Sequence, residues 1–216
     1  MSITHKFYAE KIFCFFLAFV FFAGCNSRET PENYIDFGTR AYGIHYGGAK
    51  YSASEPESGP TFFFREIVEG KFADVSTSAQ KAYACAYLAK IELRRGNVDA
   101  AVSLLDRAQA HSNQSPYREE ILGDYFYRIG NFPESDKYYE ALVAWIDARI
   151  FAVQSQNFDI NSLEFMNVRS YADSSREEKY FSIYDKRIPE TRRRAAYIEY
   201  LTQKKHTAAC RIKRGK

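Results

Sequence analysis

Residues 88–105 have the sequence LAKIELRRGNVDAAVSLL, and residues 122–139 have the sequence LGDYFYRIGNFPESDKYY. Both stretches carry a Gly-Asn pair at the same place, so that Gly96 and Gly130 are 34 residues apart. Apolar residues recur at helical spacing on both sides of each pair. Because glycine readily adopts the left-handed conformation that ends a helix, each stretch predicts two helices joined by a tight turn. We therefore expect two copies of one antiparallel helical hairpin.

The first helix of the first hairpin is predicted over Ser78 to Arg95. It is preceded by side chains whose oxygen atoms can accept a hydrogen bond from the free N–H groups of its first turn, and these candidate N-caps are Ser76, Thr77 and Ser78. The second helix carries small or apolar residues at i, i+3, i+4 and i+7, which are Ala101, Leu104, Leu105 and Ala108. Such a stripe favours packing of one helix face against the other.

This period and these positions resemble those of the tetratricopeptide-repeat (TPR) family. The matching residues are Leu88, Ala89, Gly96, Ala101, Leu105 and Ala108 in the first copy, and Leu122, Gly123, Gly130, Ser135, Tyr139 and Leu142 in the second. Glu92 and Ser135 depart from the usual aromatic residue and alanine. The resemblance covers residues 82 to about 145 and implies an all-α, helical-hairpin solenoid, in which Ala89 and Gly123 let the second helix approach closely.

Flanking helices are expected beside the two hairpins, because two repeats alone bury too little apolar surface. Residues 61–155 are therefore predicted to form one TPR-like region, with degenerate turn motifs at Gly70-Lys71-Phe72 and Gln156-Asn157-Phe158. Residues 156–216 are predicted to hold a loop, helices at Arg176–Tyr184 and Glu190–Lys205, and a frayed basic end.

The first 24 residues have the organisation of a bacterial signal peptide. Lys6 and Lys11 precede an apolar run from Ile12 to Ala23, which is shorter than the roughly 20 residues that a membrane-spanning helix needs. The sequence Phe22-Ala23-Gly24-Cys25 resembles the lipobox of bacterial lipoproteins, although Phe22 replaces the usual leucine. An ordinary secretory signal with an incidental cysteine is the alternative.

The lipobox resemblance implies cleavage before Cys25 and lipid attachment to that cysteine. Two or three acyl chains hold a protein firmly on a membrane, whereas one does not. Asn26 follows the cysteine, and the absence of Asp there resembles lipoproteins sorted to the outer membrane, which is therefore favoured over the inner membrane. Residues 25–60, rich in Ser, Glu, Gly and Pro, are predicted to form a lipidated, flexible tether with local structure.

Little in the sequence indicates catalysis. The histidines His45, His111 and His206 are isolated, and none stands at metal-ligand spacing. The glycines after Tyr46 lack the Lys-Ser/Thr that follows a phosphate-binding loop. We therefore expect no enzyme, metal site, cofactor or small-molecule substrate. Cys85 and Cys210 remain after lipidation of Cys25, and unpaired thiols are favoured over a disulfide.

Two surfaces are candidate binding sites. The TPR resemblance implies a groove lined by the first helix of each hairpin, which would bind an unidentified envelope protein or peptide. Its residues would be Tyr83, Ala86, Lys90, Leu93 and Arg94 in the first copy, and Tyr117, Glu120, Asp124, Tyr127 and Arg128 in the second. Packing of several of these tyrosines against flanking helices is an equal alternative.

The second surface is basic. Residues 186–216 carry a net charge of +9, whereas residues 26–185 carry −7. The candidate patch consists of Arg192, Arg193, Arg194, Lys204 and Lys205. It could bind an anionic lipid or cell-wall surface, or it could be a solvated helix; nucleic acid is not expected for an exported chain. The first hypothesis is thus a non-enzymatic adaptor on an envelope membrane, and the alternative is a lipoprotein that binds an anionic surface.

Overall fold

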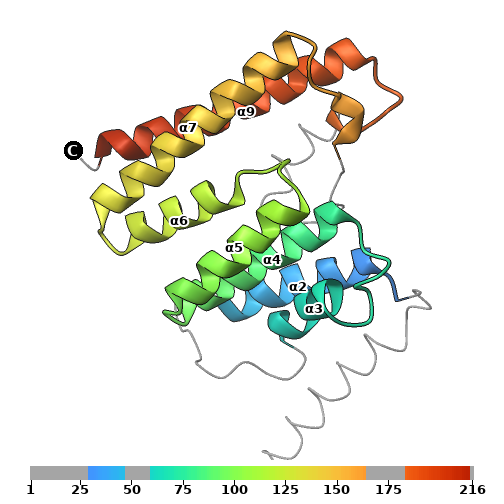
Figure 1. Cartoon of the computed structure of the whole chain (residues 1–216), viewed down its shortest axis with the longest axis vertical. Coiled ribbons are helices and arrows are strands. Elements are labelled where there is room, and N and C mark those ends of the chain that lie inside the picture. The colour runs from blue at the N-terminus through green and yellow to red at the C-terminus, as the bar shows by residue number, and fades with distance from the viewer. Residues whose placement is uncertain (1–28, 47–58, 164–182, 215–216) are drawn as a thin grey trace, which may run out of the picture. The chain divides into compact units, whose positions relative to one another are not determined.

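A computed structural model describes residues 29–46, 59–163 and 183–214, and in these residues it is all-helical, as the sequence predicts. The chain divides into two compact units, Met1–Thr30 and Pro31–Lys216, and all the described helices belong to the second. Its helices, labelled in Figure 1, are α2 (Pro31–Tyr46), α3 (Pro60–Val68), α4 (Ser78–Arg94), α5 (Val98–His111), α6 (Tyr117–Arg128), α7 (Phe132–Gln154), the 3₁₀ helix η1 (Ile160–Ser162) and α9 (Glu190–Arg214).

The two predicted hairpins are present as α4–α5 and α6–α7, and each pair packs together. The first begins where its capping residues predict. The Thr77 hydroxyl oxygen accepts a hydrogen bond from the Gln80 backbone N–H at 3.2 Å, and the Gln80 side-chain oxygen accepts one from the Thr77 N–H at 2.8 Å. This reciprocal pair satisfies two N–H groups that a helix start leaves free, so α4 begins at Ser78.

The turns follow the Gly-Asn pattern. Gly96 and Gly130 have φ values of +82° and +77°, which a side chain would disfavour. The Asn N–H that follows each glycine donates to a carbonyl five residues back, at 2.9 Å in both hairpins. Gln156 adopts the same left-handed conformation, with φ of 58°, and Asn157 donates to the Ala152 carbonyl at 3.1 Å. The degenerate motif at Gln156 therefore forms the same kind of turn at the end of α7.

Close packing inside the second hairpin depends on a glycine. A Cβ atom at Gly123 would lie 3.1 Å from the ring of Tyr139 on α7, tighter than most real contacts. The buried Ser135 hydroxyl donates to the Gly123 carbonyl at 3.0 Å, which explains how serine is accommodated where the TPR pattern has alanine. Both observations agree with the predicted need for a small residue at Gly123.

The prediction of a flexible tether over residues 25–60 is wrong for Pro31–Tyr46, which forms helix α2. Ile35 and Tyr46 are almost completely buried in one core cluster with Phe64 and residues of α4. Gly38, which suggested a tether, lies where a Cβ atom would be 3.0 Å from the Phe64 ring, so glycine allows α3 to pack closely. The apolar face of α2 is short and interrupted by polar residues, which explains why no helical period was evident.

The end of the chain is also more regular than predicted. Helix α9 continues to Arg214, because Leu201 and Ala208 are buried against α7 in a second core cluster. Figure 1 shows α7 and α9 as two long helices side by side. The helix predicted at Arg176–Tyr184 falls mostly outside the described residues. Cys85 is buried and Cys210 exposed, and both are free, in agreement with the favoured prediction.

Candidate functional site

Three of the predicted groove residues on α4 are covered by the chain itself. The Tyr83 hydroxyl lies 3.5 Å from the Thr39 hydroxyl of α2, and burial raises the pKa of Tyr83 well above its ordinary value. Leu93 is buried in a core cluster that also contains Leu105 and Leu122. Ala86 is buried in the same cluster. These residues therefore stabilise the fold, and of the three only Tyr83 keeps part of its side chain exposed.

The cations of α4 remain at the surface. The Lys90 ammonium lies 4.4 Å from the centre of the Tyr87 ring, and burial lowers the pKa of Lys90 below its ordinary value. One turn later, Arg94 is exposed. In the part of the chain that the structure describes, neither side chain makes an ion pair with a carboxylate. Glu120 of α6 is close enough to raise the pKa of Lys90, but burial outweighs this effect, so an external anion would stabilise the ammonium further.

The acidic groove positions of α6 face α9. The Glu120 carboxylate lies 2.8 Å from the Lys204 ammonium, and both side chains are partly exposed. Burial raises the pKa of Glu120, but the positive charges of Lys204 and Lys90 together lower it by more. The pKa of Glu120 therefore lies below its ordinary value. Burial lowers the pKa of Lys204, but Glu120 raises it more, so that it lies above its ordinary value. Each charge therefore stabilises the other.

One turn along α6, Asp124 has two partners. It accepts a hydrogen bond from the Tyr139 hydroxyl of α7 at 2.6 Å, and it pairs with Arg211 of α9. The Arg211 guanidinium also lies 5.9 Å from the centre of the Tyr127 ring. Lys204 and Arg211, which lie two turns apart on α9, thus pair with Glu120 and Asp124, which lie one turn apart on α6.

Two groove positions remain on α6. Tyr117 is largely buried, and this burial raises its pKa to about 12. Arg128 is exposed and makes no hydrogen bond or ion pair with a described residue. Arg128 lies close enough to Lys90 to lower the pKa of that ammonium. The structure therefore brings Lys90, Glu120, Asp124, Tyr127 and Arg128 together around the α4–α6 surface, with α9 along the α6 side.

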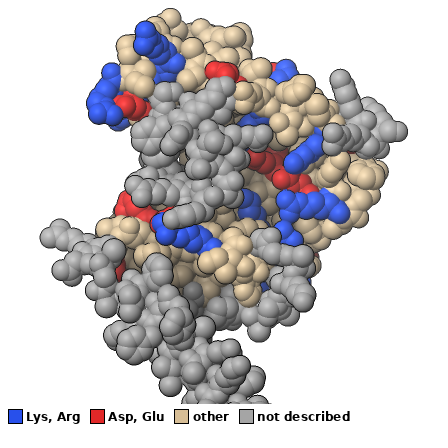
Figure 2. Space-filling view, turned by 180° about the vertical axis from the view of Figure 1, so that it is seen from behind, with Lys and Arg blue, Asp and Glu red and all other residues tan. Residues whose placement is uncertain are grey.

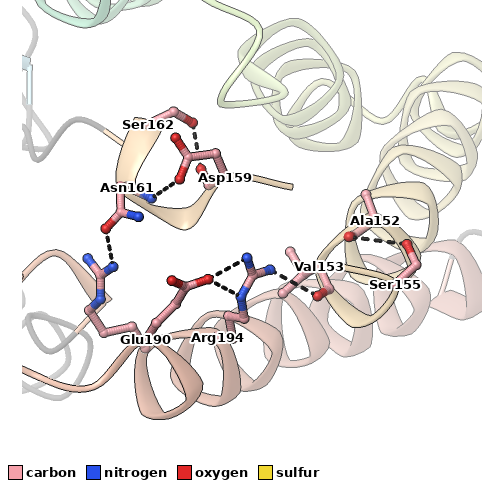
Figure 3. A network of polar contacts seen from close by, with 9 residues as sticks. Ala152, Val153, Ser155, Asp159, Asn161, Ser162, Glu190 and Arg194 are labelled. Atoms are coloured by element: carbon pink, nitrogen blue, oxygen red, sulfur yellow. Dashed lines mark hydrogen bonds and ion pairs between the residues drawn. The ribbon is translucent and has the colours of Figure 1, made fainter. Parts of the chain in front are cut away.

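The predicted basic patch is not one surface. The Arg193 side chain is buried and donates to Asn161 beside η1. Arg194 donates to the Val153 carbonyl near the end of α7 at 3.1 Å and pairs with Glu190 at 2.6 Å, as Figure 3 shows. Lys205 pairs with Asp147 of α7 at 2.6 Å. With Lys204 held by Glu120, Arg192 alone of these five has no such partner among the described residues.

The two predicted surfaces are in contact with each other. Basic side chains of α9 pair with carboxylates on α6 and α7, so Lys204 of the predicted basic patch neutralises Glu120 of the predicted groove. Figure 2 shows acidic and basic side chains next to one another on the face seen from behind. The predicted patch did not include Arg211, although this residue lies in the basic end of the chain. No local pattern links Arg211 to Asp124, because the two residues are 87 positions apart.

No group of three His, Cys, Asp or Glu side chains that could hold a metal ion occurs among the described residues. Within the same residues, no helix is long and apolar enough to cross a membrane. Comparison of the chain with protein-family models, curated proteins and solved structures found no significant match.

Proposed function

We propose that the chain is a lipid-anchored, non-enzymatic adaptor of the bacterial envelope, on the outer membrane in preference to the inner one. It binds an acidic stretch of a partner polypeptide on the surface formed by α4 and α6. This surface consists of those residues of the groove implied by the TPR resemblance that neither α2 nor the core covers.

The observation that carries this proposal is the imbalance of charge on the α4–α6 surface. Lys204 and Arg211 pair with the two carboxylates, Glu120 and Asp124. Three groove cations, Lys90, Arg94 and Arg128, keep no ion-pair partner among the residues described. An excess of positive charge attracts an acidic partner and selects against a basic one.

The tyrosines add contact area to this charged surface. Tyr127 and Tyr87 are both partly exposed, and each lies beside a cation, Arg211 and Lys90 respectively. Aromatic side chains with a polar tip are enriched at protein interfaces, because they bury a large area at a low cost in conformational entropy. Acidic side chains interspersed with apolar ones in the partner would therefore match this surface.

Site-specific photo-crosslinking tests the proposed surface. A photoreactive residue at position 128 should form adducts in intact envelopes, whereas the same residue at Gln109, exposed on α5, should not. Adding Arg94→Glu should reduce the adducts at position 128, because it replaces a groove cation with a repelling charge. Equal labelling at both positions, or adducts unaffected by Arg94→Glu, would contradict the proposal.

The anchor is tested separately. The proposal rests on the short apolar run and on the lipobox-like sequence that ends at Cys25, both of which lie outside the described residues. Cys25→Ser should abolish incorporation of labelled palmitate and leave a larger, unprocessed precursor. Labelling that survives this substitution would contradict lipid attachment at Cys25, whatever the crosslinking experiment shows.

The alternative function, binding of an anionic lipid or cell-wall surface through the C-terminal helix, receives less support. Four of the five residues that would form that patch are engaged within the chain. Charge used in internal ion pairs is not available to an external surface without breaking those pairs. The crosslinking experiment separates the two functions, because the alternative predicts no protein adduct at position 128.

A further inference from the structure

An apolar surface remains exposed on α2 and α3 after their other faces have been buried. On α2, Phe37 is 41% exposed and Ile44 is 85% exposed, although both are large apolar residues. On α3, Phe62 is 41% exposed. Tyr34 and Phe63 lie beside the two phenylalanines and are partly buried. We call Tyr34, Phe37, Phe62 and Phe63 the aromatic patch; Ile44 adds an exposed apolar side chain on the same helix as Tyr34 and Phe37.

The members of the aromatic patch support one another. Ring centres are 5.5 Å apart between Tyr34 and Phe63, 5.8 Å apart between Phe37 and Phe63, and 5.4 Å apart between Phe62 and Phe63. Tyr34 is also held edge-on by the buried Phe72, with ring centres 4.7 Å apart. The aromatic rings therefore form one continuous surface fixed to the core, in contrast to the scattered apolar residues found on most proteins.

The charges near the aromatic patch suit a lipid interface. Asp36 and Arg40, on α2, pair with each other at 2.6 Å, so together they add no net charge. Arg65 is exposed one turn after Phe62 on α3, and it makes no ion pair with any residue that the structure describes. A guanidinium beside exposed aromatic rings can bind a lipid phosphate while the rings enter the interfacial layer, where aromatic side chains are enriched.

The distance along the chain identifies the occupant. Helix α2 begins six residues after Cys25, and six extended residues span at most about 20 Å. If Cys25 carries lipid, as the proposed function holds, the start of α2 cannot lie farther than this from the lipid headgroups. We infer that the aromatic patch docks on the membrane interface and orients the folded unit, leaving the acyl chains to supply the anchorage. This inference rests on lipid attachment at Cys25.

Fluorescence quenching in vesicles tests the inference with the full lipidated chain. In a Trp145→Phe background, a single tryptophan is introduced by Phe62→Trp, or by Phe151→Trp as the control. Phe151 is 70% exposed and lies on α7, for which no extensive packing against α2 or α3 is found. Phospholipids brominated on their acyl chains should quench the Phe62→Trp indole at least about twofold more than the control.

Each outcome has a separate meaning. Equal quenching of the two variants, with mass spectrometry showing lipid on Cys25, would overturn docking by the aromatic patch and leave the anchor intact. An indole at position 62 that is shielded from aqueous iodide but not quenched by brominated lipid would show that a protein or a second copy covers it, which also overturns the inference. Absence of lipid on Cys25 would instead contradict the proposed function.

Discussion

Helices α4 and α6 occupy the same place in the two hairpins, but their surroundings differ. Ten of the 17 residues of α4 are buried, against three of the 12 residues of α6. Helix α4 packs against α2, α3, α5 and α6, so that its small residues fill a continuous core. The inner face of α6 instead carries Glu120 and Asp124, which are paired with α9.

This difference shows that one repeat pattern can specify the same hairpin twice while its neighbours decide the chemistry of each inner face. Helix α4, which is covered by apolar neighbours, carries alanine, cysteine and isoleucine on its buried face. Helix α6, which is covered by the basic helix α9, carries carboxylates, because pairing with an opposite charge compensates for the lost hydration. The inner face of α4 is therefore mainly structural apart from Lys90 and Arg94, whereas the inner face of α6 carries Glu120, Asp124 and Arg128.

The largest expected effect comes from the core position that the two hairpins share. Leu105 of α5 and Tyr139 of α7 occupy equivalent positions, and both are buried. Leu105→Ala should lower the free energy of unfolding by about 3 kcal/mol, because it leaves a cavity. Tyr139→Phe keeps the ring and removes the hydroxyl, which donates to Asp124 and accepts from Arg211, so it should cost about 1 kcal/mol.

Denaturation with urea measures both values. The comparison predicts that the ring of Tyr139 provides packing and that its hydroxyl adds only local contacts to Asp124 and Arg211, which also pair with each other. A loss in Tyr139→Phe as large as that in Leu105→Ala would mean that the hydroxyl is needed to keep α9 in place, and that the two hairpins differ more than their packing indicates.

A smaller effect is expected from the charges of the second hairpin. Glu120→Gln should lower the free energy of unfolding by about 1 kcal/mol, because it removes the partner of Lys204 in a partly exposed pair. The matched control is Asp106→Asn, which breaks the more exposed pair with Arg118 between α5 and α6 and should cost less than about 0.5 kcal/mol.

The pH dependence of this effect has a definite sign. The pKa of Glu120 is lower in the folded chain than its ordinary value. Its contribution is therefore complete above the ordinary glutamate pKa, about 4.3, and is lost as the pH falls through the lower pKa of the folded state. Unfolding curves of the wild type and Glu120→Gln should converge below about pH 4. A difference that persists unchanged at pH 3 would show that the charge of Glu120 is not its cause.

The helical hairpins and their turns could be predicted from the sequence, because local spacing alone determines them. Thr77, Gly96 and Gly130 act within a few residues of their own position. Helix α2 could not be recognised, because its burial depends on contacts with Phe64 and with α4, which lie beyond a long intervening segment.

The candidate site was predictable only in part, for a related reason. Its residue types and their register on α4 and α6 follow from the repeat period. Which of them stay accessible depends on α2 and α9, which the period does not describe. Tyr83 is covered by one of these helices, and Glu120 is neutralised by the other. Charge matching between distant helices, as in Glu120 with Lys204, becomes evident only when both helices are placed.

The smallest expected effect concerns the turn that follows α7, at the end of the second hairpin. Gln156 has φ of 58° at the place where the other two turns have glycine. A side chain in this left-handed region destabilises the folded chain by roughly 1 kcal/mol. Glycine removes this strain, but it loses more backbone entropy on folding, which offsets part of the gain. Gln156→Gly should therefore raise the free energy of unfolding by about 0.5 kcal/mol, whereas Gly130→Ala, the converse change, should lower it by about 1 kcal/mol. Thermal unfolding of the two variants measures this contrast, and a destabilised Gln156→Gly variant would show that the Gln156 side chain, rather than its backbone conformation, holds the end of α7.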